Sequence, residues 1–79
     1  MATLAEVEEL IRREDPAADL AGLHEEGERI YGEIRSVLFI PMSQDERHTW
    51  ISRHIREPLG TNGFNVGILL PLAPMETAW

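Results

Sequence analysis

The chain has 79 residues, a formal net charge of −7 and no cysteine. So short a chain forms one small core, and a deep catalytic pocket would take apolar side chains away from that core, so an enzyme that works alone is disfavoured. The negative charge disfavours nucleic acid as a partner, and the lack of cysteine excludes disulfides and thiolate chemistry from these residues.

The first predicted element is a helix over residues 4–14. Thr3 and Glu6 have the spacing of a capping box, in which each side chain accepts a hydrogen bond from the other residue's backbone N–H. Apolar residues then recur at helical spacing on one face. We expect the helix to end at residue 14, because Asp15 precedes Pro16 and the residue before a proline is pushed out of helical conformation.

The second and longest predicted element is a helix over residues 17–39. Acidic residues lie early in this stretch and Arg35 lies late, which suits the helix dipole. The spacing of its apolar residues and one glycine alternates between three and four, which is the pattern of a heptad seam. The seam consists of Leu20, Leu23, Gly27, Ile30, Ile34 and Val37. We expect it to form the core of a helical bundle, and its spacing leaves homo-oligomerisation open.

The third predicted helix covers residues 44–57. Ser43 and Glu46 form a second capping box, and the helix should end before Pro58. Basic and histidine side chains gather on it: Arg47, His48, Arg53, His54 and Arg56. These side chains either pair with acidic residues of the first two helices or form a docking surface for a partner protein. The histidines of the chain lack metal-site spacing and no pattern marks a catalytic centre, so we expect no metal, no cofactor and no enzymatic activity.

The sequence changes character after residue 58. PLGTNG has the composition of a turn or linker, and the residues that follow alternate with the period of a strand, which Pro71 and Pro74 end. A single strand has no partner in an otherwise helical chain. We therefore expect a helical domain over residues 1–58 and an extended apolar tail over residues 59–79.

Two fates are open for this tail. It either folds back to cover a thin helical core or stays unstructured until a partner protein holds it, for example by adding it as a strand to a sheet edge. In the second case we expect these partner-binding residues: Phe64, Val66, Ile68 and Leu70 of the tail, and Trp50 of the third helix.

These elements together predict a mainly α fold, with three helices over residues 4–14, 17–39 and 44–57 and an extended C-terminal tail. The acidic N-terminal residues lack the character of a signal peptide. No apolar run reaches the ~18 residues of a membrane helix. We therefore expect a cytoplasmic protein with neither membrane nor nucleic acid as a partner.

The layout of the chain resembles that of ribosomally made precursor peptides, with an acidic helical part, a glycine-rich junction and a nearly uncharged C-terminal part. The last four residues, ETAW, place a tryptophan after an alanine. This ending is similar to that of the scaffold peptides of pyrroloquinoline alkaloid pathways, of the ammosamide and lymphostin type. The resemblance implies that Trp79 is extended or tailored while attached through Ala78. It also implies partner enzymes: an aminoacyl-tRNA-dependent ligase, an oxidase and a protease that releases a small natural product. A gene-encoded Trp79 departs from a family step in which the ligase adds the tryptophan.

We therefore expect a non-catalytic precursor or scaffold peptide. One alternative is a small interaction module or accessory subunit that docks through its apolar tail. Another is a small enzyme subunit that needs a second chain to complete its site.

Overall fold

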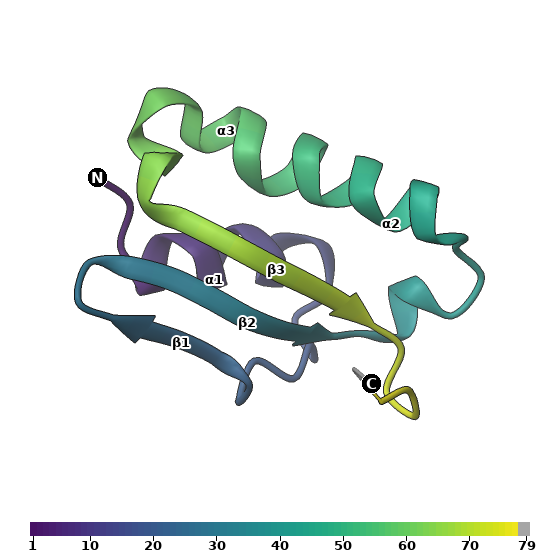
Figure 1. Ribbon diagram of the computed structural model, residues 1–79. Coiled ribbons are helices and arrows are strands. Elements are labelled where there is room, and N and C mark those ends of the chain that lie inside the picture. The colour runs from purple at the N-terminus through teal and green to yellow at the C-terminus, as the bar shows by residue number, and fades with distance from the viewer. Residues whose placement is uncertain (78–79) are drawn as a thin grey trace.

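The structure, a computed structural model, describes residues 1–77 and has two layers, a three-stranded sheet and the helices that cover one of its faces (Figure 1). The strands are β1 (Leu23–Glu26), β2 (Arg29–Arg35) and β3 (Val66–Leu72). The helices are α1 (Leu4–Glu14) and a long helix composed of α2 (Gln44–Ile51), a π-helical turn (Ser52–Arg56) and α3 (Glu57–Leu59). Short 3-10 segments cover Val37–Phe39 and Gly60–Asn65. This is an α+β fold, and the prediction of a mainly α chain with three helices is wrong.

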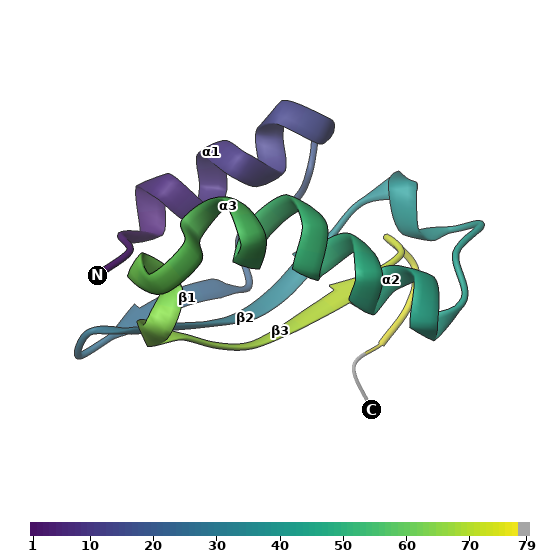
Figure 2. The same ribbon diagram turned by 90° about the horizontal axis from the view of Figure 1, so that it is seen from above.

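The sheet has the order β1-β2-β3. β1 and β2 form an antiparallel hairpin, whereas β2 and β3 are parallel. A parallel pair needs a long crossover connection, which the long helix supplies. Seen from above, α1 and the long helix lie on the same side of the sheet (Figure 2). The alternation after residue 63 therefore does form a strand, which lies at one edge of the sheet and pairs with the central strand β2.

The prediction of a helix over residues 17–39 is wrong, because this stretch contains the β1–β2 hairpin. Gly27, at the hairpin turn, has a φ of 64°. Gly32 has a φ of 129°, and a Cβ atom there would lie 2.1 Å from the carbonyl oxygen of Gly22. Both glycines thus supply backbone conformations that a helix does not use. Ile30 and Ile34 are four residues apart, a spacing that suits one face of a strand as well as one face of a helix.

The other two predicted helices are present. α1 covers residues 4–14 as expected, and both capping boxes form, at Thr3 and at Ser43. The third helix continues two residues beyond its predicted end, to Leu59. Pro58 is tolerated because the preceding turn is π-helical, with the Glu57 N–H bonded to the Ser52 carbonyl, and so already departs from the regular hydrogen-bond ladder.

The core lies between the two layers and takes apolar side chains from the sheet and from the helices. Its buried members include Val7, Ile11, Ile30, Ile34, Phe39, Ile55 and Leu69. Asn65 is buried with them and closes the end of the sheet. Its side-chain oxygen accepts a hydrogen bond from the Ala2 N–H at 2.9 Å, and its amide nitrogen donates to the carbonyls of Ala2 and Glu28. The start of β3 is thereby tied to the N-terminal segment and to the hairpin turn.

Candidate functional site

The five predicted partner-binding residues do not share one environment. Val66 and Trp50 are buried in the core. Phe64 and Ile68 are 74% and 73% exposed, and Leu70 is half-buried. Phe64 borders a hollow next to α3, away from the other two. Ile68 and Leu70 therefore remain as the predicted residues that share an accessible surface.

That surface is the face of the sheet opposite the helices, which we call the open face. The strand alternation places on it the side chains of Tyr31, Glu33, Arg35, Ile68, Leu70 and Leu72, while Ile34, Leu69 and Pro71 point into the core. Glu26 and Arg29 of the hairpin adjoin them. A hollow of about 460 Å³ lies among Glu26, Arg29, Tyr31 and Ile68. The open face thus joins an apolar row on β3 to a polar half on the hairpin.

The polar half of the open face is held by internal contacts. The Tyr31 hydroxyl donates a hydrogen bond to Glu26 at 2.8 Å, and this contact raises the pKa of Tyr31 above its ordinary value, first through the hydrogen bond and then through the carboxylate charge. Arg35 forms an ion pair with Glu33 at 3.0 Å. The ring of His24 lies 5.8 Å from that of Tyr31.

The outer edge of β3 is already occupied by arginine side chains. Arg56 donates to the carbonyls of Val66 at 3.3 Å and Gly67 at 2.9 Å, and Arg47 donates to the Pro71 carbonyl at 3.2 Å. Pro71 itself has no N–H to offer a second strand. Charge and proline are the devices by which edge strands avoid pairing with other chains. Strand addition at this edge, one of the docking modes expected from the sequence, is therefore disfavoured.

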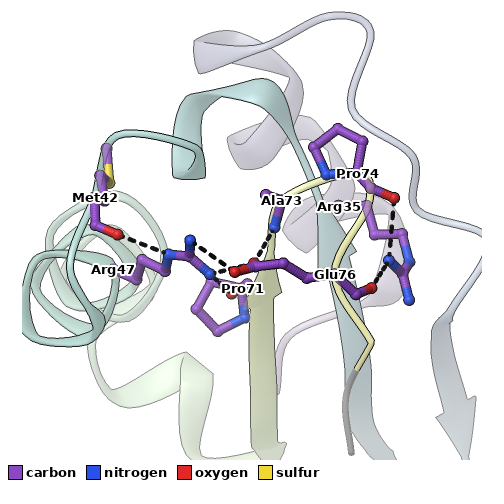
Figure 3. Close-up of polar contacts among 7 residues, drawn as sticks. All are labelled: Arg35, Met42, Arg47, Pro71, Ala73, Pro74 and Glu76. Atoms are coloured by element: carbon purple, nitrogen blue, oxygen red, sulfur yellow. Dashed lines mark hydrogen bonds and ion pairs between the residues drawn. The ribbon is translucent and has the colours of Figure 1, made fainter.

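A second site lies at the end of β3, where Arg47 and Arg35 hold the turn formed by residues 73–76 (Figure 3). We call these two arginines together with Glu76 the C-terminal clamp. Arg47 is 4% exposed. It donates to the Met42 carbonyl at 3.2 Å and to both oxygens of the Glu76 carboxylate, at 2.5 and 3.2 Å. A buried guanidinium is tolerated because these acceptors satisfy it.

Glu76 is the centre of the clamp. Its carboxylate also accepts the Ala73 N–H at 2.6 Å, and its own N–H donates to the Ala73 carbonyl at 3.0 Å, so the turn closes in both directions. Arg35 donates to the backbone carbonyls of Glu76 and Pro74. The hydrogen bond from Arg47, followed by that from Ala73, holds the pKa of Glu76 below its ordinary value.

The clamp was missed by the sequence reasoning. The sequence places Arg47 in a basic patch, yet its side chain points inward and pairs with Glu76 instead of with the first two helices. Within that patch, His54 does lie near an acidic residue of the first helix, with its Nδ1 3.7 Å from a carboxylate oxygen of Glu14. The one available signal was the isolation of Glu76, the single charged residue after Glu57. A lone charge in an apolar segment needs a partner.

Three further features considered from the sequence are a metal site, a membrane-spanning helix and a modified Trp79. Within that range no three His, Asp or Glu side chains are grouped so as to hold a metal ion. No helix in the same range has the length and apolar character needed to cross a membrane. Ala78 and Trp79, the predicted attachment point and substrate, lie outside the described residues.

No protein-family model, curated protein or solved structure matches the chain.

Proposed function

We propose that this chain is a non-catalytic interaction domain that binds a partner protein through the open face. The observation that carries the proposal is Ile68, an isoleucine that is 73% exposed on a face that no helix within residues 1–77 covers. Leu70 and Leu72, both half-buried, continue the apolar row on β3. An exposed apolar row bordered by polar groups is typical of a protein–protein contact.

The shape of the open face favours a protein over a small ligand. Small-molecule sites are concave and bury most of their ligand's surface. The hollow on the open face is lined by Ile68 of β3 and three residues of the hairpin, so its walls come from the sheet and not from a helix. The tyrosine and arginine among them, Tyr31 and Arg29, are residue types enriched where proteins contact one another.

Site-specific photo-crosslinking in the native host tests this proposal. A photoreactive phenylalanine analogue is placed at position 68 in one variant and at position 64 in another, since Ile68 and Phe64 are equally exposed but lie on different surfaces. We expect a specific covalent adduct from position 68 and none of comparable yield from position 64. Absence of an adduct from position 68, or equal adducts from both positions, would contradict the proposal.

The C-terminal clamp favours a second candidate, the precursor or scaffold peptide in which Trp79 is modified. Arg35 and Arg47 fix residues 73–76 in one conformation. An enzyme that processes Trp79 would then meet a preordered approach to it, and preorder lowers the entropic cost of binding. The folded domain would be the handle that keeps the substrate near each successive enzyme.

Mass spectrometry of the protein from its native host tests this second candidate. The C-terminal fragment beyond Met75 is measured intact and after fragmentation. A mass change confined to Trp79, a residue added after it, or loss of Trp79 to leave Ala78 would support the candidate. An unmodified ETAW in cells that express the protein would exclude it.

A further inference from the structure

We propose that the partner of the open face is a second copy of this chain, so that two sheets stack face to face in a symmetric dimer. This inference rests on the proposed function, because it uses the same face and names the partner. It is carried by the distribution of charge, by the blocked edge of β3 and by the area that the face offers.

Charge is nearly balanced on the open face and unbalanced elsewhere. The strands and the hairpin turn place on it two carboxylates, Glu26 and Glu33, and two guanidinium groups, Arg29 and Arg35. Asp19, whose backbone pairs with that of Arg35, adds a third carboxylate. The whole chain carries a net charge of −7, so most of the excess negative charge lies on the remaining surface. Two such molecules repel each other in most orientations. The open face is where two copies can approach without bringing their excess charge together.

The composition of the open face is self-complementary. A two-fold axis brings the same patch of both copies together, so each residue type must find a suitable partner within the patch itself. The apolar row of Ile68, Leu70 and Leu72 supplies the dry part of such a contact, and carboxylates and guanidiniums of opposite copies supply the polar part. A basic partner protein would instead be attracted to the acidic surface away from this face.

The contacts at the edge of β3 favour binding of the second copy at the open face over pairing at the edge. Arg47 and Arg56 occupy carbonyl groups along β3, and Pro71 lacks an N–H. A continuous sheet across two copies would have to displace these contacts. Stacking two sheets at a separation of about 10 Å leaves these arginine contacts in place and buries Ile68 of both copies.

The area available is sufficient. A specific interface buries about 1,000 Å² in total, or about 500 Å² from each copy. The molecule measures 32 × 23 × 22 Å and has an accessible surface of 4987 Å². A contact of the required size therefore uses about a tenth of the surface, which is within the reach of one face of the sheet.

Sedimentation velocity of the purified chain tests the inference. We expect wild type to form a dimer that dissociates on dilution, with a tighter association at about 0.5 M than at about 0.05 M salt, because salt screens the repulsion between the acidic surfaces. Ile68→Glu places a carboxylate in each half of the contact and should weaken the dimer by about a hundredfold or more. Phe64→Glu adds the same charge at an equally exposed site outside the open face and should leave dissociation nearly unchanged.

Circular dichroism of both variants verifies that each remains folded. Wild type that stays monomeric at about 0.1 mM in high salt would overturn the inference, since a useful dimer is well populated there. Equal weakening by the two variants would also overturn it.

The crosslinking experiment separates the two proposals. A position-68 adduct formed by two copies of the 9.0 kDa chain supports both. An adduct with a different protein, together with monomeric wild type, retains the interaction function and overturns the dimer. Absence of both adduct and dimer overturns the two proposals together.

Discussion

Arg47 and Ile68 depart from the usual distribution of residues in opposite directions. Arg47 is charged and 4% exposed, whereas Ile68 is apolar and 73% exposed. Arg47 finds hydrogen-bond acceptors within the chain, at Met42, Pro71 and Glu76. On the open face, no layer formed by the described part of the chain covers Ile68. A buried charge with internal partners is explained by folding, whereas an exposed apolar row needs an explanation outside the folded chain.

The largest effect on stability is expected at β2, the strand that contributes to both the open face and the C-terminal clamp. Gly32→Ala should lower the free energy of unfolding by about 3 kcal/mol or more, because the new Cβ meets the Gly22 carbonyl at 2.1 Å and the φ of 129° is strained for alanine. Urea denaturation measures the change. Gly67→Ala is the control, since its Cβ would have only ordinary contacts, the nearest at 3.5 Å, and should cost less than about 1 kcal/mol. Equal losses would show that the backbone at Gly32 is not the cause.

Removal of the clamp arginine should have the next largest effect. Arg47→Met keeps much of the side-chain volume but leaves the Met42 and Pro71 carbonyls and the Glu76 carboxylate without their donor. We expect the free energy of unfolding to fall by about 2–3 kcal/mol, measured by urea denaturation. Arg53→Met, on the exposed side of the same helix, should change it by less than about 0.5 kcal/mol. A neutral Arg47→Met would mean that the clamp does not stabilise the fold.

Acidification should weaken the clamp by a smaller amount. The pKa of Glu76 is lowered in the folded chain, so its contribution to stability is complete above the ordinary carboxyl value of 4.5 and is lost as the pH falls through the lower folded value. Thermal unfolding measured across this range should show a smaller acid-induced loss for Glu76→Gln than for wild type. Glu46, whose pKa is lowered by the Ser43 cap, titrates in the same direction in both proteins. Parallel curves would show that Glu76 is not coupled to folding.

The smallest effect on stability is expected at Ile68. At concentrations where the chain is monomeric, Ile68→Ser should change the free energy of unfolding by less than about 0.5 kcal/mol, because the side chain is largely exposed to water in the folded chain. The neighbouring Leu69 points into the core, and Leu69→Ala should cost about 2–4 kcal/mol. Denaturation of dilute samples measures both. A large loss from Ile68→Ser would mean that its role is in folding.

The parts of the fold that depend on local chemistry were predictable from the sequence. Thr3 and Ser43 each cap a helix through contacts with a glutamate three residues later, so both helix starts follow from adjacent residues. Ile30 and Ile34 were correctly expected in the core but assigned to the wrong element. Their spacing of four fits both periods, and the choice of strand depends on β3, which pairs with β2 only after a long crossover.

The candidate site was predictable to a smaller extent. Ile68 and Leu70 were expected at a partner contact, and the structure exposes Ile68 and half-buries Leu70. Whether a strand residue points to the core or to solvent depends on register, which is shifted by an irregularity between Ile30 and Gly32. Arg47 and Glu76 are 29 residues apart, so no local pattern links them.

The parallel pairing of β2 with β3 has a consequence for biosynthesis. β3 is translated after every other described strand and helix, so the nascent chain carries β2 with one edge unpaired until synthesis has passed Leu72. Contacts that join distant parts of a chain form late and slowly. A truncated product that stops before Val66 would keep that edge open, and an open hydrophobic edge recruits other strands. Incomplete translation products of this chain are therefore expected to aggregate, and cells that make the protein would have to degrade or shield them.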